Sequence, residues 1–428
     1  MKVFKIIILF ICSINFAIAQ DSNIVAKAKK KWINSATSKA IPINNIYSDD
    51  FSDLMFLKDQ IQDKRIVFLG ESSHGVDEFN VLKFRLIRFL SQEMDFKVVA
   101  FESGVDECGR VNLAKDSLSS PEMVAHSLKV IWWVKNNCHM MSYIKENNID
   151  IAGLDPNNVA SLLKFKDYAS IFQGDLLLAK KLYQIDSLNF KYNIKRMKYY
   201  QEEGTNLKTA NSLDSLKEYL SLQYYFSRDD LRKNTTIDRH SKLILTEGIT
   251  SKIMELNTSN QDKKDIETFF VATTKRDSIM ATNLEFLIDS IYPNKKIIVW
   301  AHNGHIRKNY DKWYYPILSY ANDIIRGNSY SIAINGWGGS YAVGHKIKEC
   351  GSTKKNSVEG ILYNVPHEIF FIPIKVENKK EDKWLKTELR EGFHGTWRRL
   401  NNTYDAMFFI KGVTGSELIN FNKVSSCE

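Results

Sequence analysis

Short, almost entirely apolar runs recur along the chain, and amphipathic segments separate them. Residues 65–69, 97–101 and 150–154 are such runs. The segment 77–95, between the first two, has its apolar residues at helical spacing: Phe79, Leu82, Leu86, Phe89 and Leu90. A strand, a helix of that length and a second strand form a βαβ unit, which favours parallel pairing with a right-handed crossover.

The second half of the chain continues this pattern after a long interruption. Further apolar runs predict strands at 296–301, 330–334, 368–375 and 405–411. Between about residues 160 and 290 the strand signals disappear, and helical spacing predicts four long helices: 176–203, 212–230, 239–257 and 264–291. Strands flank this stretch on both sides. We therefore expect one α/β domain over 20–428, a layered α/β sheet with mostly parallel strands and a large helical insertion at about 160–290.

The N-terminus has the features of a secretory signal peptide. Lys2 and Lys5 precede a short apolar run, and Ala17-Ile18-Ala19 fits a small-x-small cleavage site. The run is shorter than the ~20 residues that span a bilayer. We therefore expect residues 1–19 to be removed after Ala19, and the mature chain, which has no later transmembrane segment, to be secreted or periplasmic.

Composition excludes several classes of protein. The chain has 428 residues, 44% of them hydrophobic and 25% charged, which are ordinary globular values. The net charge of +9 is spread without a block of like charges, so no nucleic-acid partner is indicated. The oligomeric state stays open. Export permits disulfides, but the cysteines after the signal peptide lack metal-binding spacing and their pairing stays open: Cys108, Cys138, Cys350 and Cys427.

Polar side chains that can take part in acid–base chemistry follow one predicted strand after another. The carboxyl ends of parallel strands form the crevice where open α/β sheets bind ligands. If these strands are parallel, one site should collect the residues at their ends: Glu71, His74, Glu102, Asp155, His302 and His305. Isolated burial of so many ionisable groups is costly, so they must pair with each other, with solvent or with a ligand.

These residue types support acid–base hydrolysis. A histidine near neutral pKa can take a proton from water, and a neighbouring carboxylate can fix its tautomer. Glu71 and His74 lie three residues apart in one glycine-flanked loop, so they can share a face. His302 could then protonate a leaving group or bind an oxyanion.

Three alternatives compete with this mechanism. A serine nucleophile at Ser72 is disfavoured, because Gly70-x-Ser72-x-His74 does not have the spacing of G-x-S-x-G. A metal-dependent hydrolase would use the same histidines as zinc or iron ligands, but no segment reads H-E-x-x-H. A non-catalytic protein that binds haem or another bulky apolar ligand is the third alternative. We expect no required metal or cofactor.

Several motifs resemble the erythromycin esterase family, over about residues 60–415. The first region contains Gly70-Glu71-Ser72-Ser73-His74-Gly75 and, further on, Val98-Val99-Ala100-Phe101-Glu102. The second contains Arg276-Asp277 and then Val299-Trp300-Ala301-His302-Asn303-Gly304-His305. The stretch from Tyr404 to Ile410 is similar to the family's last strand.

The resemblance implies an α/β hydrolase that cleaves a small-molecule ester or lactone, with the macrolactone of erythromycin-type antibiotics as the candidate substrate. It implies that His74 is the general base for water and that Glu71 orients it. Glu102 matches a second required acid, and His302 and His305 match histidines tied to activity. We assign His74, Glu71, Glu102 and His302 as catalytic candidates.

The remaining candidates are assigned to substrate binding. Lys83 falls where some family members carry an arginine, and Arg276 falls near another functional arginine. Asn303 and Asp155 follow predicted strands and join His305 in this group.

Two departures from the family pattern concern substrate identity. Asn137 stands where the family often has a glutamate, and Asn157 where many members have a glutamine. Two further features have open interpretations. The stretch Trp337–Tyr341 is either a mobile loop or a hairpin turn. The aromatic residues of the helical insertion form either a wall for an apolar substrate or ordinary helix packing: Tyr199, Tyr200, Tyr219, Tyr224, Tyr225 and Phe226.

Overall fold

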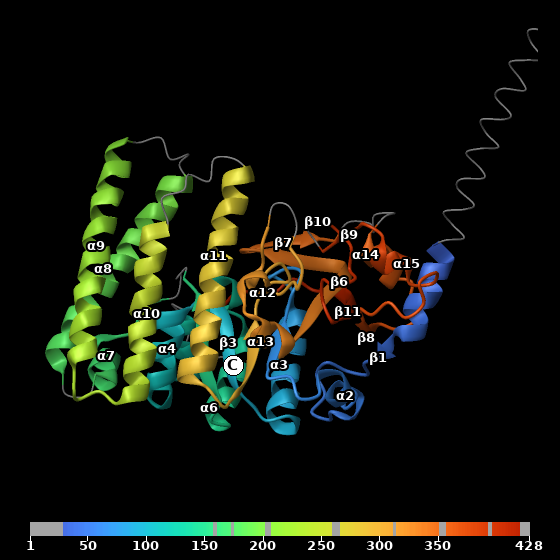
Figure 1. Cartoon of the computed structure of the whole chain (residues 1–428), viewed down its shortest axis with the longest axis horizontal. Coiled ribbons are helices and arrows are strands. Elements are labelled where there is room, and N and C mark those ends of the chain that lie inside the picture. The colour runs from blue at the N-terminus through green and yellow to red at the C-terminus, as the bar shows by residue number, and fades with distance from the viewer. Residues whose placement is uncertain are drawn as a thin grey trace, which may run out of the picture.

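A computed structural model of the chain describes residues 29–156, 161–172, 175–201, 207–258, 266–310, 314–350, 357–392 and 396–419. Its centre is a nine-stranded sheet in the order β1-β8-β11-β6-β2-β5-β3-β4, with β7 paired to β6 (Figure 1). The strands are β1 (Ile41–Pro42), β2 (Ile66–Leu69), β3 (Phe96–Gly104), β4 (Asp150–Asp155), β5 (Lys296–Trp300), β6 (Ser329–Val343), β7 (Lys346–Glu349), β8 (Ile369–Pro373) and β11 (Ala406–Val413). A separate two-stranded sheet pairs β9 (Leu389–Glu391) with β10 (Thr396–Arg398).

Helices cover both faces of the sheet. Residues 29–39 are helical. The longer helices are α3 (Asp77–Glu93), α4 (Val105–Ala114), α5 (Ser120–Ser127), α6 (Lys135–Glu146), α7 (Phe165–Ile171), α8 (Leu176–Gln201), α9 (Leu207–Lys233), α10 (Arg239–Thr258) and α11 (Ile266–Phe286). The short ones are α2 (Leu57–Ile61), α12 (Ile317–Tyr320), α13 (Asp323–Gly327), α14 (Val358–Leu362) and α15 (Lys383–Lys386). The α/β class expected from the sequence is thus confirmed.

The two faces of the sheet form two hydrophobic clusters. Side chains alternate along a strand, so Val67 and Leu69 of β2 pack with α3 and α6, while Ile66 and Phe68 pack with α11 and α14. Such strands are apolar throughout because both their faces are covered. This is why each of them appears in the sequence as a short apolar run.

Pairing within the centre of the sheet is parallel. The pairs β11–β6, β6–β2, β2–β5, β5–β3 and β3–β4 are all parallel, so these six strands end at one edge. β8 runs antiparallel to β11, and β1 antiparallel to β8, at the far side of the sheet. The mostly parallel prediction is confirmed, and the shared edge is the one on which the predicted site depends.

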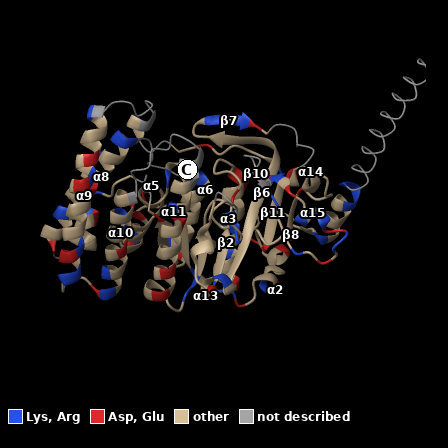
Figure 2. Cartoon of the chain, turned by 45° about the horizontal axis from the view of Figure 1, so that its top comes forward, with Lys and Arg blue, Asp and Glu red and all other residues tan. Residues whose placement is uncertain are grey.

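The helical stretch lies where the sequence placed it, between β4 and β5. Helices α8, α9 and α10 stand side by side beyond the β4 edge, and α11 returns the chain to the sheet (Figure 1). Figure 2 shows Lys and Arg mixed with Asp and Glu on these helices. This mixture agrees with the sequence, in which no block of like charges occurs. None of the described helices is both long and apolar enough to cross a membrane.

The structure defines two features that the sequence left open. Trp337–Tyr341 is part of β6, which continues to Val343 and turns back into β7 as a hairpin, so the stretch is neither a loop nor the turn itself. Among the described cysteines, Cys138 is disulfide-bonded and Cys108 and Cys350 are free. Residues 1–19, Asn157 and Cys427 lie outside the described residues.

Candidate functional site

The loop after β2 is held in place by two close backbone approaches. A Cβ on Gly70 would lie 2.0 Å from the side-chain oxygen of Asn303, and a Cβ on Gly75 would lie 2.0 Å from the carbonyl oxygen of Ala342. Only glycine fits at either position without moving a neighbour. These two contacts fix both ends of the segment that carries Glu71 and His74.

Glu71 is a fully buried carboxylate with three hydrogen-bond partners. It contacts His74 Nδ1 at 2.6 Å, Lys83 Nζ at 2.7 Å and Trp132 Nε1 at 2.9 Å. Burial alone would raise its pKa, but the charge of Lys83 and the bonds from His74 and Lys83 outweigh burial and lower the pKa to about 2. Glu71 is therefore ionised throughout the physiological range.

The ionised Glu71 determines the tautomer of His74. A carboxylate only accepts hydrogen bonds, so His74 Nδ1 must carry the proton that points toward it. The neutral ring then has a lone pair on Nε2. The His74 side chain is 32% exposed, whereas Glu71 is enclosed. A buried carboxylate behind a partly exposed imidazole is the arrangement of a general base with its orienting group.

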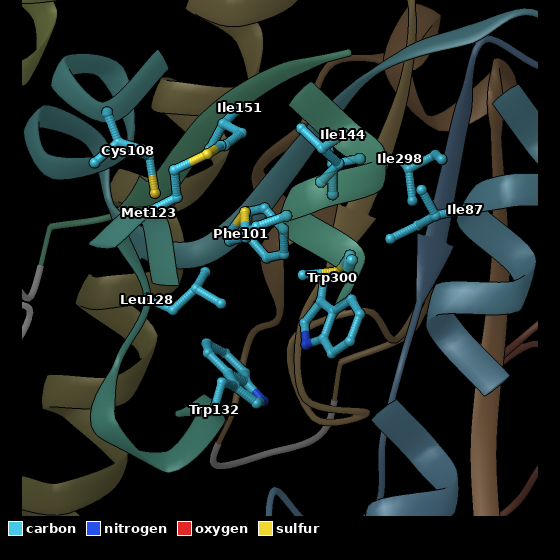
Figure 3. Packing of buried hydrophobic residues seen from close by; sticks show 14 of the residues in the cluster. Ile87, Phe101, Cys108, Met123, Leu128, Trp132, Ile144, Ile151, Ile298 and Trp300 are labelled. Atoms are coloured by element: carbon cyan, nitrogen blue, oxygen red, sulfur yellow. The ribbon is translucent and has the colours of Figure 1, made fainter. Parts of the chain in front are cut away.

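Lys83 lies beneath Glu71 and not at the surface of the site. Its side chain is fully buried on α3, with Nζ 4.2 Å from the centre of the Trp300 ring. Burial lowers the pKa of Lys83, and the charges of Glu71 and Glu102 oppose that shift. Figure 3 shows Trp132 and Trp300 among the packed hydrophobic residues. Their ring centroids are 6.3 Å apart, and the rings are nearly perpendicular. The geometry indicates that Lys83 acts by pairing with Glu71 and does not contact the substrate directly.

A second charged group forms where β3 and β4 end. Arg276 Nε donates to Asp155 Oδ1 over 2.9 Å, and Arg276 Nη2 donates to both Asp155 and, over 2.5 Å, Glu102. Lys129 Nζ donates to Asp155 and lies 3.4 Å from Glu102. The two carboxylates are thus shared between two cations. Burial raises the pKa of Glu102, but His305, Lys129 and Arg276 outweigh burial and hold it well below its usual value.

His305 extends this group toward α11. Its Nδ1 lies 2.6 Å from Asp277 Oδ1, its Nε2 lies 3.4 Å from Glu102 Oε1, and the Tyr314 hydroxyl donates to Asp277 over 2.6 Å. Burial would lower the pKa of His305, but the charges of Asp277 and Glu102 outweigh burial and raise it to about 9. His305 is therefore an imidazolium at neutral pH, held between two carboxylates.

His302 has the opposite electrostatic character. Its ring lies 5.1 Å from that of His74, and its backbone N–H donates to Glu102 Oε2 over 2.9 Å. Burial, and then the charge that His74 carries when protonated, lower the pKa of His302 to about 3, so the His302 ring is neutral. Since its Nδ1 accepts the Gly304 N–H at 3.0 Å, its proton sits on Nε2. His302 can therefore donate a hydrogen bond, but it does not supply a positive charge.

Asn303 is turned inward. Its amide nitrogen donates to Asn335 Oδ1 over 2.6 Å and to the Ile334 carbonyl over 3.2 Å, and its side-chain oxygen accepts the Ile334 N–H at 3.3 Å. The side chain is buried, and both its polar atoms are engaged with β6. This placement indicates that the Asn303 side chain holds the loop in position. It does not favour the contact with substrate that the sequence predicted.

The rival chemistries find little support in the described residues. The Ser72 hydroxyl is buried and has no hydrogen-bond partner among them, so no base activates it. No group of three or more His, Cys, Asp or Glu side chains within the described ranges is arranged to hold a metal ion. His305 has a carboxylate at each ring nitrogen, and His74 Nδ1 is occupied by Glu71.

The structure brings the predicted site residues together at one edge of the sheet and adds four that were not assigned there: Lys129, Trp132, Asp277 and Tyr314. Asp277 stands next to Arg276 in the sequence, so an acidic residue beside a candidate arginine could have been recognised as a further site residue. Lys129 and Trp132 lie in the segment between α5 and α6 and not at a strand end, so the strand-end criterion could not find them.

The aromatic residues of the insertion divide by position. The Tyr224 hydroxyl is buried and donates to Asp186 over 2.6 Å, which is helix packing. Tyr219, Tyr225 and Phe226 are exposed on α9, and the side chain of Tyr200 lies outside the described residues. Tyr224 thus fits the helix-packing alternative, and an apolar wall formed by the others stays a hypothesis.

Comparison with known proteins places this geometry in a family. The family model described as erythromycin esterase matches residues 91–413. The chain belongs to the erythromycin esterase family. The chain is also similar to the Bacillus subtilis (strain 168) protein named "Putative hydrolase YbfO", with 26% identity over 446 residues that cover 96% of this chain and 97% of that protein.

Two erythromycin esterases are also similar to this family member. Erythromycin esterase type II of Escherichia coli is 22% identical over 418 residues, covering 86% of this chain and 96% of that enzyme. An erythromycin esterase mutant solved in its open conformation superposes with a TM-score of 0.62 at 17% identity, covering 89% of this chain and 99% of that one. At that identity the structural likeness establishes the fold alone.

Proposed function

We propose that this member of the erythromycin esterase family hydrolyses an ester or lactone with a water molecule that His74 activates. The observation that carries the proposal is the contact between buried, ionised Glu71 and the partly exposed ring of His74. Since this contact places the proton of the neutral ring on Nδ1, Nε2 of a fixed ring carries the lone pair. A general base needs that combination of orientation and lone pair.

The reaction follows from the protonation states. The water oxygen attacks the ester carbonyl carbon while His74 Nε2 takes a proton from the water. The carbonyl oxygen becomes an oxyanion, to which His302 Nε2–H donates. The oxyanion then collapses, the C–O bond to the alcohol breaks, and the proton on His74 passes to the leaving oxygen. The products are an acid and an alcohol, with no covalent enzyme intermediate.

The charged group around Glu102 supports this chemistry by holding His302. Glu102 accepts the backbone N–H of His302, and Arg276 and Lys129 keep the Glu102 carboxylate ionised and fixed. Because such a donor is already in position, no free energy is needed to reorient it when the oxyanion forms. Glu102 therefore acts as a positioning residue for the oxyanion donor in this proposal.

The candidate substrate is the macrolactone of an erythromycin-type antibiotic. Its support is the family membership and the likeness to an enzyme named erythromycin esterase type II. We further propose that the enzyme acts outside the cytoplasm, since its N-terminus has the pattern of a cleaved signal peptide.

The test is incubation of purified protein with erythromycin and with a panel of simple esters, followed by mass spectrometry. We expect a lactone to gain the mass of one water, or an ester to be cleaved into its acid and alcohol. This activity should be lost in His74→Ala. Full activity in His74→Ala, or no hydrolysis of any compound, would refute the proposal. Persistence of activity after exhaustive chelation separates it from a metal-dependent hydrolase.

A further inference from the structure

Three tyrosines form an exposed aromatic patch beside the loop that carries His302 and His305. Tyr310, Tyr315 and Tyr320 are 63%, 38% and 41% exposed. The rings of Tyr310 and Tyr315 are stacked, 4.8 Å apart and only 8° from parallel, and Tyr320 lies 6.3 Å from Tyr315. We call these three residues the tyrosine platform. Single exposed aromatic residues are common, but a stacked and exposed group marks a binding surface.

A row of rings connects the platform with the proposed general base. The ring of His74 lies 5.1 Å from that of His302, which lies 6.5 Å from that of His305. The ring of His305 lies 6.3 Å from that of Tyr314, and Tyr315 is the next residue in the chain. The row ends at Tyr314, so the segment that carries Tyr315 and Tyr320 adjoins the His305 end of the row and not the His74 end.

The platform is also anchored to the helix that supplies Arg276 and Asp277. Tyr320 ends α12, which packs against α11 (Figure 1). Burial, and then the charge of Asp277, raise the pKa of Tyr320, which places Tyr320 within electrostatic reach of the partner of His305. The platform is thus held on the same framework as the site.

We propose that the tyrosine platform is a specificity subsite that stacks against a ring in the part of the substrate remote from the scissile ester. This inference rests on the proposed function and deepens it, because it requires a large, ring-bearing ester or lactone. Tyrosine offers a wide, rigid contact surface at low entropic cost, and its ring face suits the apolar face of another ring.

The separation of the platform from His74 along this row of rings selects the substrate class. A small ester held between His74 and His302 lies at the other end of the row from Tyr315, so contact with both needs a larger substrate. Binding energy from such a remote group is what an enzyme can use to orient the reacting carbonyl. The platform therefore distinguishes ring-bearing substrates from simple esters.

The experiment compares two ester series that differ only in a terminal ring. n-Alkyl acetates and ω-phenylalkyl acetates of increasing chain length are hydrolysed by the wild type, Tyr310→Ala and Tyr315→Ala. The wild type should favour the ring-bearing ester only in the longer members, by about tenfold in kcat/KM. Both alanine variants should lose that preference, and Tyr315→Phe, which keeps the ring, should retain it.

Tyr47→Ala is the matched control, because Tyr47 is 65% exposed but lies in the segment between β1 and α2, outside the candidate site. It should keep the preference. A wild type without the preference, or alanine variants that retain it, would overturn the inference.

Failure of the proposed function gives a different result, since no ester in either series would then be hydrolysed. In that case binding of the longest phenylalkyl acetate to the wild type and to Tyr315→Ala is measured by calorimetry. Equal affinities, or no binding to either protein, would overturn the inference, and weaker binding to Tyr315→Ala would uphold it.

Discussion

The backbone N–H of Asn303 donates to the carbonyl oxygen of Glu71 across 2.8 Å. This bond joins the loop after β2 to the loop after β5, and these two strands are parallel neighbours in the sheet. The side chain of Asn303 continues the link to β6 through Asn335 and Ile334. One residue thus connects the ends of β2 and β5 with the middle of β6, and the proposed base and oxyanion donor are held at a fixed separation.

Asn303→Ala is expected to loosen this connection. Asn335 and the backbone of Ile334 would lose buried hydrogen-bond partners, so we expect a loss of about 1–3 kcal/mol in the free energy of unfolding. We expect kcat to fall more than KM rises, because the groups that move are catalytic. Urea unfolding and steady-state kinetics measure the two effects.

Asn309→Ala is the control for that variant, because Asn309 lies in the same segment and its side chain donates only to Thr403 among the described residues. It should leave both quantities nearly unchanged. An Asn303→Ala protein with normal stability and an increase in KM alone would instead support the direct substrate contact predicted from the sequence.

Ser72→Ala should remain active. The Ser72 hydroxyl is buried without a partner in the described part of the chain, so its removal relieves an unsatisfied polar group. We expect kcat/KM within about twofold of the wild type and an unfolding free energy that is equal or higher. Complete loss of hydrolysis, with the fold intact by circular dichroism, would restore the serine-nucleophile mechanism.

Glu71→Gln should cost both activity and stability. It removes the charge that pairs with buried Lys83 and the acceptor that orients His74. Breaking a buried ion pair by changing one partner costs about 3–5 kcal/mol, because the other charge remains buried. Loss of an orienting carboxylate lowers kcat by about 10²–10⁴.

The double variant Glu71→Gln/Lys83→Met separates these two effects. It removes both charges, so most of the lost unfolding free energy should return while kcat stays low. Chemical denaturation and esterase kinetics on the same preparations provide the comparison. Recovery of activity together with stability would mean that Glu71 only supports the fold and does not orient His74.

The sequence identified most of the fold because strands buried on both faces are short apolar runs. Polar residues immediately after those runs had to meet at one edge once the strands were parallel, which is why Glu71, Glu102, Asp155 and His302 could be grouped in advance. Strand direction at the far side of the sheet was not encoded in the runs, so the antiparallel pairing of β8 with β11 required the structure.

The depth and orientation of individual side chains could not be predicted in this way. Lysine is usually exposed, and the burial of Lys83 depends on Glu71 and Trp300, which come from the loop after β2 and from β5. Lys129 and Trp132 reach the site from a segment between two helices. Such contacts are tertiary, and neither periodicity nor strand-end position signals them.

The raised pKa of His305 predicts a specific dependence of stability on pH. The folded value is about 9 against 6.5 for the free side chain. A pKa that is raised on folding stabilises the native state fully below 6.5, and this contribution disappears as the pH rises through about 9. The advantage of the wild type over His305→Gln in unfolding free energy should therefore shrink by about 3 kcal/mol between pH 6 and pH 10.

Urea unfolding of both proteins at a series of pH values measures this difference. Tyr314→Phe is the matched variant, since it keeps His305 between Asp277 and Glu102 and should retain the pH dependence of the wild type. A difference between wild type and His305→Gln that stays constant from pH 6 to pH 10 would mean that His305 is not held as an imidazolium. A difference that grows with pH would mean that its pKa is lowered on folding, because the neutral ring would then be the stabilised form.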